Sequence, residues 1–226
     1  MKEGIIKKFF RGQASKTQHG IILGLVLSIV AVLWLIAQIL FEGEYSILNN
    51  HISNQGRPDL NPKGFIFFTI GCMISGIFLI FHFIYLYNNY SPTLKPILIL
   101  STAFGVIASI SFIVIGFIPG TISWSVHNFF ADLAFSSFYL SSFLILIIML
   151  RKIQKKQAWP SIKKGGIVYG IFFIILILTI VIPQLDFLAD EWNLDERLFQ
   201  PPLWQWTSLF NIVIWLLNVY LIIPSE

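Results

Sequence analysis

The chain has 226 residues, of which 56% are hydrophobic and only 12% are charged. Soluble domains carry about 25% charged residues, so this chain lacks the polar side chains that a water-facing globule needs. Its single cysteine excludes an intramolecular disulfide and a zinc site built from several thiolates. The composition therefore indicates an integral membrane protein.

Six apolar segments each approach the length of about 20 residues that a helix needs to cross a bilayer. In chain order they are 20–41, 65–88, 97–118, 128–150, 166–185 and 203–223. These segments predict an all-α, polytopic bundle of six transmembrane helices that forms a single domain over 20–223. A basic segment, 1–19, precedes the bundle, and a short tail, 224–226, follows it.

The Lys and Arg residues of the predicted loops are unevenly distributed. Twelve of the fifteen lie in 1–19, 89–96 and 151–165, and the other three lie in the loops of the opposite face. Loops rich in Lys and Arg stay in the cytoplasm, so this count predicts a multi-pass protein of the cell membrane with both termini inside. The distribution also explains the basic net charge without a nucleic-acid partner.

Small residues recur at four-residue spacing in two of the spans. The first span has Gly20, Gly24 and Ser28, and the third has Ser101, Gly105 and Ser109. Small residues let helix backbones approach closely in a membrane, so both stripes are predicted to be packing faces.

The fourth span carries a polar stripe and the only charged residue in any span. At 100° per residue, its members fall within a 120° arc: Asn128, Asp132, Ser136, Tyr139 and Ser142. A carboxylate inside a bilayer is costly and usually faces the bundle interior or a wet cavity. We therefore expect Asp132 to face inward, in the outer half of the membrane, and to bond to Gln38, Gln205 or Ser208.

Two short motifs resemble a known family. The first is HISNQG at 51–56, followed by Asn61-Pro62 and Phe65, and the second is GFIP at 116–119, followed by His127, Ala131 and Phe135. Together they resemble the prokaryotic membrane family catalogued as domain of unknown function nine-nine-eight, and more distantly the eukaryotic Frag/DRAM/Sfk group. The resemblance implies a six-helix bundle with its N-terminus inside and a connection to lipids, and it implies no catalytic set.

The sequence contains no HExxH, GxSxG, P-loop or GxGxxG motif, so we predict no metal and no cofactor. His127 and Asp132 are the candidate catalytic residues, although whether the protein is an enzyme stays open. The two residues are five positions apart and would point 140° apart on one continuous helix. A direct His–Asp dyad therefore requires the fourth helix to begin after His127.

The polar residues at the outer ends of the predicted helices suggest a ligand site. We expect a pocket open to the outside and lined by Gln38, His127, Asn128, Asp132 and Gln205. Such a pocket would bind or modify a membrane lipid or a lipid-linked head group, because one end would be polar and the other apolar. Two alternatives remain: a scaffold that binds a protein partner or a second copy, and a small transporter or channel that uses Asp132.

Overall fold

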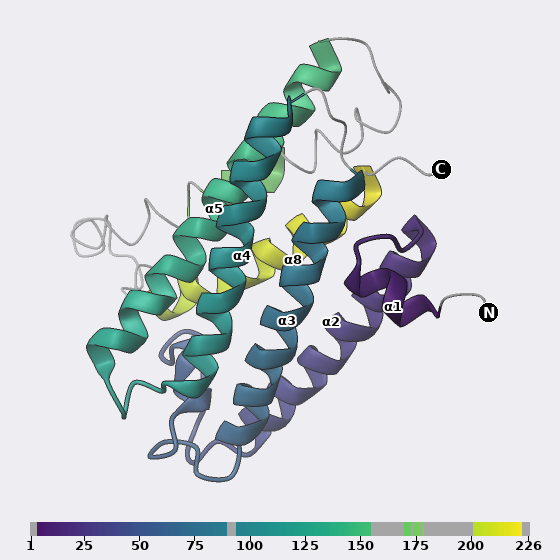
Figure 1. The fold of residues 1–226 in the computed structure, drawn as a ribbon. Helices are drawn as coiled ribbons and strands as arrows, with labels where there is room; N and C mark the ends of the chain where they lie inside the picture. Colours follow the sequence, from purple (N-terminus) through teal and green to yellow (C-terminus); the bar gives the residue numbers. More distant parts are fainter. Residues whose placement is uncertain are drawn as a thin grey trace, which may run out of the picture.

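The computed structural model describes residues 4–89, 94–154, 170–172, 174–176, 178 and 201–222, and all long elements in these ranges are helices. In chain order they are α1 (Ile5–Phe10), α2 (Lys16–Ile39), the 3₁₀ helix η1 (Ile52–Gly56), α3 (Phe65–Asn89), α4 (Lys95–Phe117), α5 (Trp124–Gln154) and α8 (Pro201–Ile222). Helices α2 to α5 lie side by side, and α8 crosses behind them (Figure 1).

Four of these helices are long and apolar enough to cross a membrane, namely α2, α3, α4 and the part of α5 up to residue 151. They match the first four predicted spans, and α8 overlaps the sixth. The fifth, 166–185, lies outside the described residues apart from 170–172, 174–176 and 178, which are helical. The helical, membrane-type architecture is confirmed, whereas the count of six helices stays a prediction.

Two helices begin four residues earlier than the hydropathy pattern predicts, because serine side chains cap them. Ser15 and Gln18 form a capping box at the start of α2, in which each side chain accepts a hydrogen bond from the other residue's backbone N–H. At the start of α5, the Ser123 hydroxyl accepts from the Val126 N–H at 3.4 Å. The histidines at positions 19 and 127 therefore lie inside helices.

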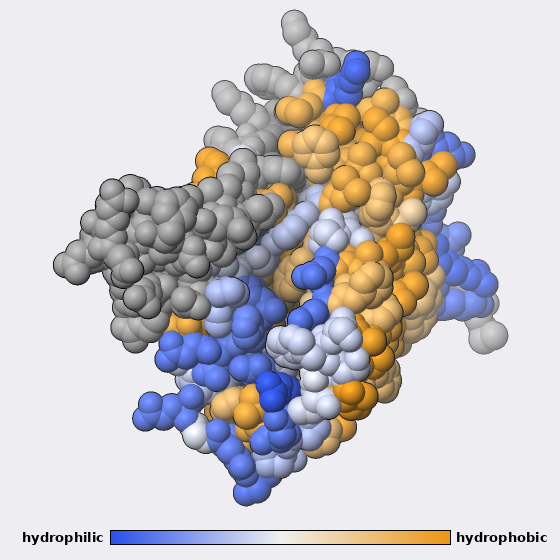
Figure 2. Space-filling view, turned by 90° about the vertical axis from the view of Figure 1, so that its left-hand side faces the viewer, coloured by the Kyte–Doolittle hydropathy of each residue, from blue (hydrophilic) through white to orange (hydrophobic). Residues whose placement is uncertain are grey.

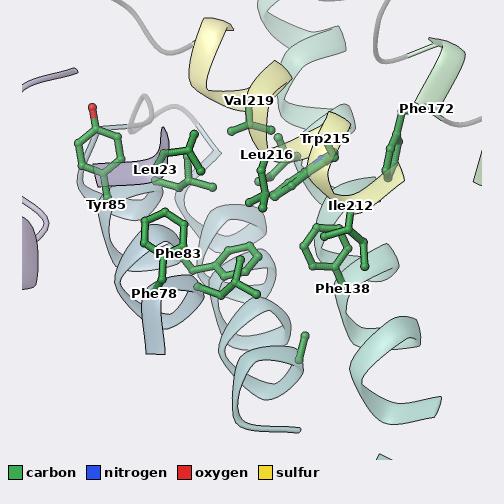
Figure 3. Packing of buried hydrophobic residues seen from close by; sticks show 14 of the residues in the cluster. Leu23, Phe78, Phe83, Tyr85, Phe138, Phe172, Ile212, Trp215, Leu216 and Val219 are labelled. Atoms are coloured by element: carbon green, nitrogen blue, oxygen red, sulfur yellow. The ribbon is translucent and has the colours of Figure 1, made fainter. Parts of the chain in front are cut away.

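The core is centred on Trp215 of α8, which is fully buried. Its indole meets the ring of Phe138 on α5 edge-on, with centroids 4.8 Å apart, and lies 5.9 Å from the ring of Phe83 on α3 (Figure 3). Aromatic pairs of this kind contribute about 0.5–1.5 kcal/mol beyond the area that they bury. Trp215 thus attaches α8 to the middle of the bundle.

The small-residue stripe of α4 packs as predicted. Ser101 and Ser141 of α5 each donate from their hydroxyl to the other's carbonyl, at 3.0 and 2.8 Å, so the two backbones lie close together. Gly105 lies against the ring of Phe83, and Ser109 is also buried.

The prediction was wrong for most of the α2 stripe. Gly24 and Ser28 are exposed, and only Gly20 lies against another helix, at the ring of Tyr220 on α8. The reason is the rotation of α2: its buried residues, among them Val30 and Ala37, lie about 120° or more from Gly24 and Ser28 at 100° per residue.

We expect Gly105→Ala to destabilise the bundle by about 1–3 kcal/mol, because a Cβ at this position would overlap the Phe83 ring. Gly24→Ala is the matched control, since no atom lies within 4 Å of its added Cβ and alanine favours a helix over glycine. Thermal unfolding of both variants in detergent measures the difference. Equal midpoints for the two would contradict this account of the α3–α4 contact.

Candidate functional site

One end of the bundle, here called the loop end, carries the loop of residues 40–64; the opposite end, where α1 lies, is called the N-terminal end (Figure 1). The fully buried Asn61 holds the loop in place. Its side-chain amide donates to the carbonyls of Ala37 at 2.9 Å and Gln55 at 2.8 Å, and its side-chain oxygen accepts from the Gly64 N–H at 3.0 Å. One side chain therefore joins the end of α2, the loop and the start of α3.

The loop is also bonded to α8. The Gln205 side-chain oxygen accepts from the Ile52 N–H at 2.8 Å. Within the loop, the Tyr45 hydroxyl donates to the His51 carbonyl at 3.3 Å. Burial raises the pKa of Tyr45, although neighbouring Gln55 and Trp206 oppose the shift. Burial lowers the pKa of His51, although the nearby Gln205 side chain opposes it. Both shifts favour neutral side chains, so hydrogen bonds without formal charge hold the loop to the helices.

His127 closes the turn between α4 and α5. Its Nδ1 lies 2.7 Å from the carbonyl oxygen of Ile118, and the residue is only 3% exposed. A carbonyl only accepts, so Nδ1 carries a proton and donates it to this oxygen. The second sequence motif thus folds back on itself through this bond.

The two sequence motifs face each other across a cavity of about 30 Å³. Ile52 and Ser53 of η1 lie on one side, His127 and Ala131 of α5 on another, and Gln205 of α8 closes it. No described residue bonds to the Ser53 hydroxyl or to His127 Nε2. A cavity of this size holds about one or two water molecules.

A larger groove of about 580 Å³ runs between α2 and α8. Its walls are apolar apart from Ser28, Gln38 and the indole nitrogens of two tryptophans; it is lined by Leu27, Ser28, Val30, Ala31, Trp34, Leu35, Gln38, Trp206, Leu209, Phe210 and Val213. Two of these residues, Leu35 and Phe210, are more than half exposed. The groove therefore opens sideways, toward the space that a bilayer would occupy.

A third cavity, of about 60 Å³, lies inside the bundle and is almost entirely apolar. Trp34 and Leu209 line this central cavity, the groove and the smaller cavity at His127. The three hollows therefore adjoin at these two side chains. In the space-filling view, apolar residues cover much of the described helices and polar residues gather toward the loop end (Figure 2).

Comparison with known proteins places this architecture in a family. A family model described as "Protein of unknown function (DUF998)" matches residues 22–222. The chain belongs to the DUF998 family. No curated protein and no solved structure matches it. The resemblance carried by the two motifs is thereby confirmed, and its extension to the eukaryotic Frag/DRAM/Sfk group stays a prediction.

In this DUF998 protein, the five predicted site residues do not converge on one pocket. His127 and Gln205 line the same small cavity, and Gln38 lines the groove. Asn128 is half-buried and Asp132 is exposed, and neither lines any of the three hollows. The cavity at His127 lies beneath η1 and is far smaller than a lipid head group.

The expectation that Asp132 faces inward is wrong. The buried face of α5 is centred on His127, Ala134 and Phe138, and at 100° per residue Asp132 points about 140° away from His127. Its side chain bonds to none of Gln38, Gln205 and Ser208. The physical reason is that close approach to α4 requires small side chains, which occupy the face opposite the polar stripe.

A direct His127–Asp132 dyad is excluded as well, because α5 begins at Trp124 and both residues lie on one continuous helix. Among the described residues, no group of three or more His, Cys, Asp or Glu side chains is placed to hold a metal ion. The described part of the chain therefore shows no catalytic constellation around His127.

Sequence reasoning missed a pair of fully buried histidines at the N-terminal end, His19 on α2 and His82 on α3. His19 Nε2 lies 2.9 Å from His82 Nδ1. Because the first span was predicted to begin at residue 20, His19 was counted as part of a loop. The capping box at Ser15 and Gln18 is the signal that would have placed it inside the helix.

We expect Asn61→Ala to lower the free energy of unfolding, because it leaves the buried Ala37 and Gln55 carbonyls and the Gly64 N–H without partners, at about 1–3 kcal/mol for each unpaired group. Asn49→Ala is the matched control, since Asn49 is an exposed residue of the same loop. Thermal unfolding measures both, and protease cleavage within 40–64 reports on the loop. Identical behaviour of the two variants would show that Asn61 does not anchor the loop.

Proposed function

We propose that this protein binds a membrane lipid, with one acyl chain lying in the groove between α2 and α8. The observation that carries the proposal is the groove itself, whose volume of about 580 Å³ lies within the range of ligand pockets. Its apolar walls and its sideways opening suit a ligand that arrives from within the bilayer.

The length of the groove favours a lipid chain over a partner helix. On α2 it extends from Leu27 to Gln38, which corresponds to about 16 Å at 1.5 Å per residue. This is about half of the 30 Å hydrocarbon core of a bilayer. A lipid chain occupies one leaflet, whereas a transmembrane partner helix would follow α2 along its whole length.

The polar part of the lipid would lie at Gln38, one residue before the end of α2. An amide side chain both donates and accepts hydrogen bonds, so it suits an ester carbonyl or a hydroxyl near the glycerol backbone. In this proposal His127 and Gln205 act from the adjoining cavity, where His127 holds the α4–α5 turn and Gln205 holds the loop. Asn128 and Asp132 have no part in it.

Binding, rather than chemical modification of the lipid, is the activity that this geometry supports best. In its neutral form the His127 ring has a lone pair on Nε2, as a general base requires, but the cavity in front of it has room for only about one or two water molecules. Trp34 and Leu209 stand between that cavity and the groove. An ester bond in the groove would thus be separated from the His127 imidazole.

The groove can be tested with a phosphatidylethanolamine that carries a photoreactive diazirine in one acyl chain. Ala31→Trp places an indole inside the groove, so we expect labelling of the full-length protein on α2 and α8 to fall about fivefold or more, since a filled pocket excludes the chain. Val32→Trp is the matched control, because Val32 is exposed on the same helix but does not line the groove. Mass spectrometry of the labelled peptides measures both.

Two outcomes would contradict the proposal. Equal labelling of the Ala31→Trp and Val32→Trp variants would show that the lipid lies around the bundle and not in the groove. Absence of labelling on α2 and α8 in the unmodified protein, together with capture of a second polypeptide by cross-linking at Ala31, would instead favour the scaffold function.

We further propose that the protein crosses the cell membrane with the loop end outside and the N-terminal end in the cytoplasm, as the distribution of Lys and Arg favours. Glu44→Cys and Gln13→Cys add one exposed thiol at each end, and the native Cys72 is buried. We expect an impermeant maleimide to label Glu44→Cys in intact cells and Gln13→Cys only after permeabilisation. Labelling in the reverse order would overturn this orientation.

A further inference from the structure

The buried pair of histidines at the N-terminal end has no role in the lipid groove. His19 and His82 are both 0% exposed and are joined by a bond of 2.9 Å between His19 Nε2 and His82 Nδ1. The other nitrogen of each ring, His19 Nδ1 and His82 Nε2, is buried and has no hydrogen-bond partner. Unpartnered buried polar atoms are uncommon and call for a physical explanation.

Aromatic rings enclose the pair and separate it from water. The His19 ring stacks on Tyr85 with centroids 3.8 Å apart and planes 5° from parallel, and Phe78 lies 6.1 Å away on the same helix, α3. Figure 3 shows Phe78 and Tyr85 extending from α3 beside Leu23 of α2. The ring of Phe9, from the short helix α1, lies 5.7 Å from both His19 and Phe78. Phe9 therefore covers the pair.

A neutral pair can be buried in this way, but a protonated pair cannot be buried without a large cost. In the neutral pair one ring donates its N–H to the other, which satisfies the two facing nitrogens. An added proton would create a charge and a further N–H donor, although among the described residues neither outer ring nitrogen has a hydrogen-bond partner. Burying an unpaired charge is far more costly than burying a neutral polar group.

The charges around the pair would oppose protonation further. On the described helices at this end, every charged side chain is basic; these are Lys7 and Lys8 on α1, Arg11 after it, Lys16 on α2, Lys95 on α4 and Arg151 on α5. Tyrosines are the other titratable groups there: Tyr85 and Tyr87 on α3, and Tyr220 on α8, whose ring lies 5.5 Å from the Lys16 ammonium. The described carboxylates, by contrast, lie at the loop end or on the half of α5 nearest to it.

We propose that His19 and His82 form a proton-operated latch for α1, in which protonation of the pair displaces Phe9 and releases α1 from α3. Water entering the opened site would satisfy the additional N–H groups and solvate the charge. Acidification at the N-terminal end therefore shifts the equilibrium toward the released form, beginning below about pH 6.5, where a solvated histidine takes up its proton.

The attachment of α1 is suited to such a release. Besides Phe9, the ring of Phe10 meets Phe81 of α3 edge-on with centroids 4.6 Å apart. Two side-chain amides of α3 also hold the segment: Asn88 donates to the Arg11 carbonyl at 3.1 Å, and Asn89 donates to the Gly12 carbonyl at 3.3 Å. Gly12 has φ +64°, a left-handed conformation that glycine adopts readily. The segment can thus turn at Gly12 while α2 keeps its cap at Ser15.

The latch can be measured through a thiol placed beneath α1. Ala14 is 3% exposed and packs in the core cluster, whereas Gln13 beside it is exposed. We compare maleimide labelling rates of Ala14→Cys and Gln13→Cys in the full-length protein in phosphatidylcholine nanodiscs. The ratio of the Ala14→Cys rate to the Gln13→Cys rate cancels the effect of pH on thiol reactivity. We expect this ratio to rise at least about tenfold between pH 7.5 and 5.5, since one linked proton permits up to about tenfold per pH unit.

Replacing both histidines with glutamine, His19→Gln with His82→Gln, keeps polar side chains but removes the titrating groups. In the Ala14→Cys background we expect the double variant to show a labelling ratio that does not change with pH. A pH-dependent ratio in a folded double variant would overturn the proposal. If the double variant does not fold, the labelling ratio of the protein with both histidines still tests the proposal. A labelling ratio that stays constant from pH 7.5 to 5.5 would show that no latch exists.

Discussion

The loop end depends on the hydrogen bonds that Asn61 makes with the backbone. The last carbonyls of a helix have no partner within the helix, and at Ala37, which is fully buried, water cannot supply one. Asn61 satisfies this carbonyl and at the same time fixes the loop and the start of α3. The position of Ile52 against Gln205, and with it the cavity at His127, follows from that arrangement.

The sequence predicts the positions of the helices better than it predicts the candidate site. Length and hydropathy were sufficient for four spans, because a run of about 20 apolar residues has few other outcomes. The packed side of α4 was predictable from Ser101 and Gly105, because close backbone approach needs small side chains. On α5 the same rule would have identified Ala131, Ala134 and Ser141, but the polar stripe at Asp132 was given more weight. A polar stripe shows that one face of a helix differs from the others, but it does not show which neighbouring helix that face contacts.

The groove and the histidine pair were beyond sequence reasoning for another reason. Each is formed by helices that are distant in sequence, residues 27–38 with 206–213 in the groove and His19 with His82 in the pair. Hydropathy gives the depth of each residue but not the neighbour or the rotation of its helix. Depth alone correctly placed Gln38 and Gln205 near one end, yet it could not show that one lines the groove and the other closes a separate cavity.

The cavity at His127 and the His19–His82 pair lie toward opposite ends of the bundle. The central cavity inside the bundle is almost entirely apolar. The central cavity is lined by aliphatic and aromatic side chains with Ser75 as its polar exception. Transporters carry polar or ionisable groups along the path of their substrate, whereas the lining of the central cavity offers Ser75 alone.

The width of the groove depends on a residue that does not line it. Helices α4 and α5 close on each other through Ser101 and Ser141, whereas the bulky Trp34 and Trp206 stand in the groove between α2 and α8. Trp34 is accommodated because its indole lies against Gly71 of α3, where even a single added carbon would overlap it. A side chain at Gly71 would displace Trp34, so the contact between α2 and α3 sets the shape of this wall of the groove.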